Sequence, residues 1–204
     1  MRLWIICAAS AEPELPRRCS SRALAEEMAR ILDEPIKPSG AKTVKANGRA
    51  VYSSPRQCAI STAHAVVADA EALEEPLLDE LPTPEILGGR TLPCRLLRLL
   101  IFLRSLLGVG LAAERRRADE LIDRLERAGE DCVLVSHPGF IAVLIDRLRV
   151  RGYCAQRTGF GRIKPLEQML LSRRDEHCGG CAHNCLLSNP GCNIGRDKAA
   201  RAAR

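Results

Sequence analysis

Four of the ten cysteines in this 204-residue chain lie close together near its C-terminus, with the spacing C-x2-C-x3-C-x6-C. Four thiolates at this spacing can surround one zinc ion or one iron–sulfur cluster, and the spacing alone does not separate the two. The segment has too few apolar residues to form a core, so metal ligation is the interaction that would order it. We therefore expect a zinc or iron–sulfur site whose ligands are Cys178, Cys181, Cys185 and Cys192.

Two histidines lie in the same segment, and either His177 or His183 can replace one of the thiolates as a ligand. The alternative is a tail that binds no metal and carries free thiols or a surface disulfide. The last residues, 196–204, are rich in Arg and Lys. We interpret them as a solvated tail rather than a nucleic-acid-binding patch.

Composition narrows the class of protein. Apolar residues make up 46% of the chain and charged residues 27%, which is typical of a soluble globular domain. Aromatic residues make up only 3%, and a net charge of +6 is modest, so a nucleic-acid partner is not indicated. The N-terminus lacks the order of a signal peptide. We therefore expect a cytoplasmic protein, in which clustered cysteines indicate metal binding before disulfides.

The most apolar later stretch is 92–111, which Arg95, Arg98 and Arg104 interrupt. No uninterrupted apolar run approaches the ~20 residues of a membrane span, so we expect no membrane partner. The stretch is predicted to be a buried or half-buried helix. The alternative is a membrane-surface helix with arginines on one side.

Apolar runs that alternate with amphipathic segments predict an α/β fold. Strands are expected at 3–8, 50–53 and 132–136, with a last one at 166–171; helices are expected at 21–33, 54–70, 92–107, 114–128 and 139–149; 73–89 is expected to be a loop. Such a mostly parallel sheet carries helices on both faces, and chemical groups lie at the carboxyl ends of its strands. We place this domain at residues 1–171 and the Cys-rich tail at 172–204.

Four segments at these strand ends carry a family resemblance. They read MRLWIICAA from residue 1, VYSSPRQC from 51 (with Thr62-Ala63 behind it), EPLLDE from 75 and VLVSHPGF from 133. In this order and spacing, residues 1–171 resemble the histidine phosphatase superfamily, the phosphoglycerate-mutase-like proteins. The resemblance implies a three-layer sandwich with a mostly parallel central sheet. It also implies a pocket in which His137 is retained and Glu80 is the proton donor.

The departures from the family pattern fall on the catalytic positions. Ala8 stands where the family has its nucleophilic histidine, and a methyl side chain cannot accept a phosphoryl group. Cys7 and Cys58 stand where the family has phosphate-binding arginines. Charged hydrogen bonds of that kind contribute roughly 1.5–3 kcal/mol each. Arg56, two residues before Cys58, would lie about 200° around a helix from it, a poor position from which to replace it.

The resemblance and its gaps therefore indicate a catalytically inactive pseudo-phosphatase. It would act as a binding or regulatory module for a protein or a small phosphorylated ligand. One alternative is a weak phosphomonoester hydrolase that uses His137 and Glu80. Another is an iron–sulfur or zinc sensor on a phosphatase-like scaffold.

The resemblance also implies that Cys7, Cys58 and His137 converge on one pocket. Two thiolates and an imidazole suit zinc or thiol redox chemistry. The alternative is that both cysteines are small apolar replacements left after catalysis was lost. The remaining cysteines, Cys19, Cys94, Cys132 and Cys154, are expected to be structural.

Overall fold

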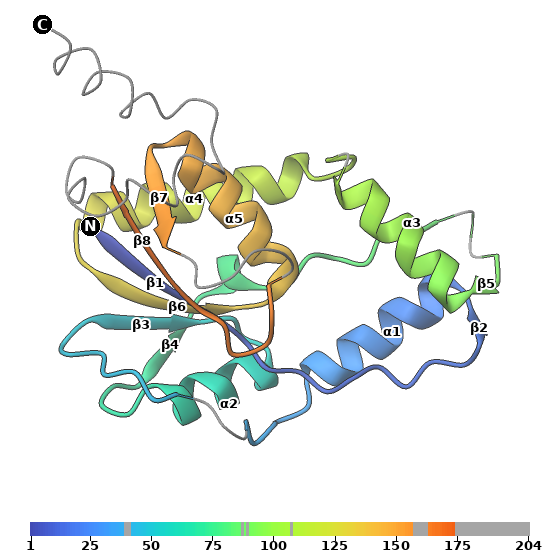
Figure 1. Ribbon diagram of the computed structural model, residues 1–204, viewed down its shortest axis with the longest axis horizontal. Coiled ribbons are helices and arrows are strands. Elements are labelled where there is room, and N and C mark those ends of the chain that lie inside the picture. The colour runs from blue at the N-terminus through green and yellow to red at the C-terminus, as the bar shows by residue number, and fades with distance from the viewer. Residues whose placement is uncertain (39–41, 87, 89, 107, 157–162, 174–204) are drawn as a thin grey trace, which may run out of the picture.

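The computed structural model describes residues 1–38, 42–86, 88, 90–106, 108–156 and 163–173. Its centre is a six-stranded sheet of order β4-β3-β6-β1-β8-β7 (Figure 1). The strands are β1 Arg2–Cys7, β3 Ala50–Ser53, β4 Ala72–Glu74, β6 Cys132–Ser136, β7 Tyr153–Gln156 and β8 Gln168–Arg173. Strands β4, β3, β6 and β1 are parallel, and β8 pairs antiparallel with both β1 and β7. The fold is thus α/β with a mostly parallel sheet, as expected from the sequence.

The register of the central strands determines where the candidate site lies. Every residue of β6 is buried, as expected for an apolar run in the middle of a parallel sheet. Cys7 of β1 pairs with Ser136 of β6, and Ser53 of β3 pairs with Val135. The carboxyl ends of these three strands therefore lie side by side, at one edge of the sheet.

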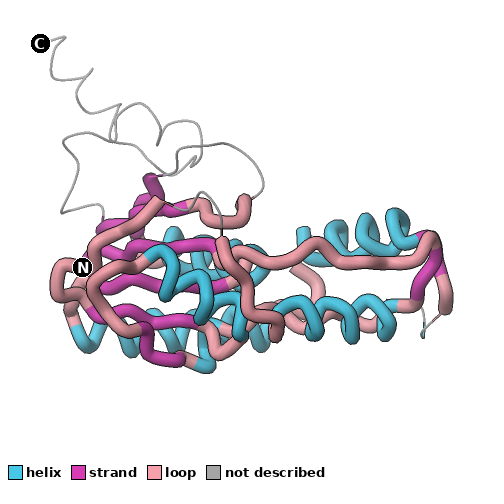
Figure 2. Tube along the Cα trace, turned by 90° about the horizontal axis from the view of Figure 1, so that it is seen from below, coloured by secondary structure: helices cyan, strands magenta, loops and turns pink. Residues whose placement is uncertain are grey.

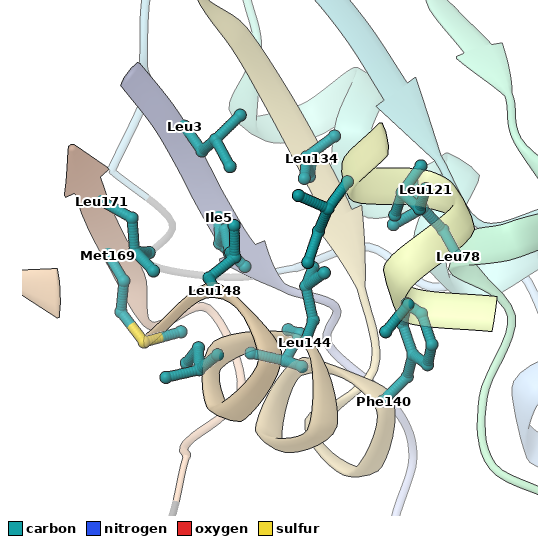
Figure 3. Close-up of a cluster of buried hydrophobic side chains, with 14 of the residues drawn as sticks. Leu3, Ile5, Leu78, Leu121, Leu134, Phe140, Leu144, Leu148, Met169 and Leu171 are labelled. Carbon is teal, nitrogen blue, oxygen red and sulfur yellow. The ribbon is translucent and has the colours of Figure 1, made fainter. Parts of the chain in front are cut away.

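Different helices pack against the two faces of the sheet. The main helices are α1 Ser21–Leu32, α2 Gln57–Val66, α3 Cys94–Leu106, α4 Ala112–Ala128 and α5 Pro138–Val150, with a short 3-10 helix, η1, at Pro76–Leu78. The larger core joins sheet residues such as Leu3 and Leu134 to α5 residues such as Leu144 (Figure 3). The smaller core lies on the other face, where Val133 and Val135 pack with α2.

Helices α1 and α3 form an arm that extends away from the sheet (Figure 2). A two-stranded pair, β2 Arg18–Cys19 with β5 Leu92–Pro93, closes its far end. Cys19, Leu24 and Leu97 make a small core inside this arm. No helix among the described residues has both the length and the apolar composition needed to cross a membrane.

Several boundaries differ from those expected. Helix α2 begins at Gln57 and not at Ser54, because the Ser54 N–H donates to the Val135 carbonyl (2.9 Å) and the extended backbone therefore continues past β3. Strand β4 and helix η1 lie in the segment expected to be a loop, and β7 was not expected. Strand β8 begins two residues after Leu166, whose backbone has a positive φ of 62°.

Candidate functional site

Three polar side chains form a row at the carboxyl edge of the sheet. His137 follows β6 directly, Ser54 follows β3, and Cys58 lies in the first turn of α2. The His137 Nε2 atom is 3.0 Å from the Ser54 hydroxyl, and its Nδ1 atom is 4.0 Å from the Cys58 sulfur. Only 1% of His137 is exposed, and the other two residues are fully buried. Both ring nitrogens of the imidazole therefore have a partner inside the protein.

This row of residues carries no charge near neutral pH. Burial lowers the pKa of His137 to about 4, and the nearby Asp79 carboxylate only partly opposes this effect. Burial likewise raises the pKa of the Cys58 thiol to about 12. Removing a group from water disfavours its charged form, so the imidazole is neutral and the thiol stays protonated. A neutral imidazole has one donor and one acceptor nitrogen, which suits a hydroxyl on one side and a thiol on the other.

Ala8 is packed into the smaller core at the end of β1. Its N–H donates to the Ser136 carbonyl (2.7 Å), which extends the pairing of β1 with β6 by one residue. The next N–H, that of Ala9, donates to the Thr62 hydroxyl (3.1 Å), which itself donates to the Cys58 carbonyl (2.7 Å). Ala8 and Ala9 are thus buried, and the backbone at the end of β1 is tied to α2.

Cys7 does not join the row. Side chains alternate along a strand, so Cys7 and Ala8 point to opposite faces of the sheet. Cys7 belongs to the larger core, with Leu78 and Phe140. Burial raises the pKa of its thiol to about 12, and the Glu80 and Glu167 carboxylates add to that effect. The described residues contain no group of three or more His, Cys, Asp or Glu side chains that could hold a metal ion.

Arg56 is held by two aspartates at the rim of this site. Its guanidinium makes a two-pronged ion pair with Asp79 (Nε–Oδ1 2.8 Å, Nη2–Oδ2 3.2 Å), and Nη1 donates to Asp33 (3.1 Å). Burial opposes ionisation of Asp79, yet the hydrogen bonds from Arg56 hold the pKa of that carboxyl below its usual value. Arg56, the arginine of the VYSSPRQC segment, is therefore already paired with carboxylates.

Glu80 accepts hydrogen bonds at the N-terminus of α5. Its Oε1 atom accepts from the N–H groups of Leu81 (2.8 Å) and Phe140 (2.9 Å), and its Oε2 atom accepts from Gly139 (3.4 Å). A carboxylate here satisfies helix N–H groups that have no partner within the helix. Burial nevertheless raises the pKa of Glu80 above its ordinary value. The motif alone indicated a proton donor and missed this capping role.

Gly139 leaves the space that Glu80 occupies. A Cβ atom at this position would lie 2.5 Å from Glu80 Oε1 and 3.2 Å from Leu81 Cδ1. The position of the Glu80 carboxylate therefore requires a residue without a side chain at 139.

Cys19, Cys94 and Cys132 are also free thiols. Cys132 is buried in β6. Cys19 and Cys94 pack together at the far end of the arm, where burial, then a hydrogen bond with Cys94, raises the pKa of Cys19 to about 11. Cys178, Cys181, Cys185 and Cys192, the expected metal ligands, lie outside the described residues.

A solved structure is similar to this chain. No protein-family model matches the chain, and no curated protein matches it. Among solved structures, it is similar to a histidine-to-alanine mutant of phosphoserine phosphatase from Entamoeba histolytica in complex with phosphoserine. The two chains share 21% identity with a TM-score of 0.44, over 73% of this chain and 80% of that chain.

The buried state of His137 has a measurable consequence in acid. Its pKa of about 4 is lower in the folded protein than the value of about 6.5 in an unfolded chain, so below that higher value the unfolded chain binds the proton first. We expect the free energy of unfolding to fall as the pH drops from about 6.5 to about 4, by up to about 1.4 kcal/mol per pH unit. Urea unfolding of the wild type and of His137→Gln, over that range, isolates this contribution because other groups are common to both. Parallel pH profiles would contradict a buried, neutral imidazole.

Proposed function

We propose that residues 1–171 form a histidine-phosphatase-like domain, a three-layer sandwich, that no longer transfers phosphoryl groups and acts as a binding or regulatory module. The observation that carries this proposal is the row of Ser54, His137 and Cys58. It is buried and uncharged at the place where a phosphatase of this family would hold its phosphate.

Phosphoryl transfer requires positive charge at the site where negative charge develops. A protonated thiol and a neutral imidazole supply none. The charge of Arg56 is balanced by Asp79 and Asp33, and the helix N–H groups of α5 are already bound to Glu80. A phosphate dianion would therefore meet no free cation among these residues, which supports a role other than catalysis.

Weak hydrolysis by His137 and Glu80 is the second candidate. The raised pKa of Glu80 favours it, because a proton donor must hold its proton near neutral pH. The geometry argues against it, since His137 is enclosed and bonded through both ring nitrogens. A nucleophile in that state would have to break both contacts and open the site before it reached a substrate.

An assay of aryl phosphate hydrolysis tests the choice between these candidates. The purified wild type is expected to give no turnover above that of His137→Ala. Glu26→Gln, a change on the exposed face of α1, serves as a control for contaminating phosphatases. Turnover that persists in the control and disappears in His137→Ala would overturn the non-catalytic proposal.

The partner of such a module is a protein or a small phosphorylated ligand. Because the row of residues is closed to solvent, we place recognition on the outer surface, which favours a protein. We also propose a cytoplasmic location. Five cysteines of the described residues form no disulfide, which supports a reducing compartment; they are Cys7, Cys19, Cys58, Cys94 and Cys132.

The Cys-rich tail is proposed to bind one zinc ion or one iron–sulfur cluster. Its spacing supports this proposal, and a sensor function for the whole protein would rest on it. Anaerobically purified protein is expected to hold either one zinc per chain, without colour, or iron with sulfide, with a brown colour. Replacing Cys181 and Cys185 with serine should remove the metal, whereas Cys94→Ser, a thiol of the arm, should retain it. Neither metal at stoichiometry in the wild type would contradict this assignment.

A further inference from the structure

Helix α3 exposes an apolar face on the outside of the arm. Its inward face is accounted for, because Leu97 is buried against α1 in the arm core. The outward face carries four large apolar side chains with much of their area in solvent: Leu96 (43%), Leu99 (50%), Phe102 (59%) and Leu103 (42%). At helical spacing these residues lie on one side. Val109, just beyond the helix, is also exposed. Contiguous apolar area of this kind marks an interaction surface.

The charges on α3 are all positive. The helix contains Arg95, Arg98 and Arg104, and no Asp or Glu. Arg95 and Arg98 are exposed beside the apolar face, and neither makes an ion pair with another described residue. The neighbouring helix, α1, does carry acids, but Glu26 pairs with Arg22 and Glu27 with Arg30. The exposed face of α3 is therefore apolar and cationic.

Neither a second copy of this chain nor its own C-terminal segment suits the exposed face of α3. A second copy would bring the arginines of one α3 toward those of the other. The segment 174–204 is itself basic, with five Lys or Arg against three Asp or Glu. An anionic lipid surface complements both properties, since its headgroups attract cations and its acyl boundary accepts apolar side chains.

We propose that α3 is a membrane-surface helix that binds anionic lipid. Leu96, Leu99, Phe102 and Leu103 would enter the acyl boundary, while Arg95 and Arg98 reach the lipid phosphates with their stems along the apolar region. A 13-residue helix is too short to span a bilayer, so it would lie in the interface plane. The arm extends away from the sheet (Figure 2), and the apolar side chains of α3 are exposed, so a flat surface can reach them. This inference goes beyond the proposed function and replaces the expectation of no membrane partner.

Vesicle flotation of the full chain tests the proposal. The wild type is expected to float with vesicles of phosphatidylcholine and phosphatidylserine, to bind pure phosphatidylcholine vesicles far less, and to be released by salt. Phe102→Glu should abolish flotation. The double variant Arg95→Glu, Arg98→Glu should reduce binding to the anionic vesicles by at least about tenfold.

Leu73→Glu provides a matched control, because Leu73 is equally exposed (58%) but lies on β4. It should float as the wild type does, and circular dichroism checks that each variant is folded. The proposal is overturned if the wild type stays unbound, if it binds neutral vesicles equally well, or if the control loses as much binding as Phe102→Glu. Dimerisation through α3 without vesicle binding would also overturn it.

Discussion

Replacing Cys58 with arginine is expected to destabilise the protein by at least about 3 kcal/mol, although arginine is the residue that the family pattern places there. Cys58 is fully buried, and its sulfur faces the neutral imidazole of His137. A guanidinium at this position would need space that is already filled, and its charge would have to leave water. Urea unfolding, followed by far-ultraviolet circular dichroism, measures the effect.

Two further variants separate the causes of that loss. Cys58→Met adds volume without charge, and overpacking of this kind costs about 1–3 kcal/mol. Gln57→Arg adds the same charge at the adjacent, exposed position, so its effect should stay within about 0.5 kcal/mol. If Cys58→Arg were as stable as the wild type and bound inorganic phosphate, the site would be an open phosphate pocket and the account would fail.

Gly139→Ala is expected to cost about 1–3 kcal/mol, although glycine-to-alanine changes inside helices are usually stabilising. The new Cβ would lie 2.5 Å from Glu80 Oε1, so the carboxylate must move away from the N–H groups that it accepts from. Those groups are at the first turn of α5 and have no other partner among the described residues.

A double-mutant cycle shows whether that clash is the cause. With Glu80→Ala already present, the same glycine change should cost less than about 0.5 kcal/mol, which gives a coupling of at least about 1 kcal/mol. Equal costs in both backgrounds would mean that Glu80 does not cap α5. In that case the carboxyl would be free to act as a proton donor.

Strand β6 and helix α1 could be predicted because each has a clear pattern in its own residues. The bounds of β6 were predicted because its five residues form an uninterrupted apolar run. Helix α1 begins at Ser21, as expected, and the Ser20 side chain accepts from the Ala23 N–H as an N-cap does. Strands β4 and β7 are three and four residues long at the two edges of the sheet. These two strands form because they pair with β3 and β8, and their own residues carry no hydrophobic pattern from which a strand could be predicted.

The site was predicted in part. The family resemblance implied that Cys58 and His137 lie in one pocket, and in the structure the Cys58 sulfur is 4.0 Å from the His137 Nδ1 atom. Cys7 packs in the larger core and Ala8 in the smaller one, because neighbours in a strand face opposite sides; the Cys7 thiol is still near enough to Cys58 for the two to interact electrostatically. The pairing of Arg56 with Asp79 and Asp33 is a contact between distant residues, which spacing does not predict.

The proposed function depends on a buried, neutral His137 in a site that holds no anion. An NMR titration of the histidine side chains, with and without inorganic phosphate, measures the charge of His137 and its response to an anion. The His137 signal is assigned by comparison with the spectrum of His137→Gln. We expect His137 to stay neutral until the pH approaches about 4, and phosphate to leave its titration unchanged. A His137 that titrates near the ordinary value of about 6.5, or whose pKa rises when phosphate is added, would contradict the account and restore the phosphate pocket.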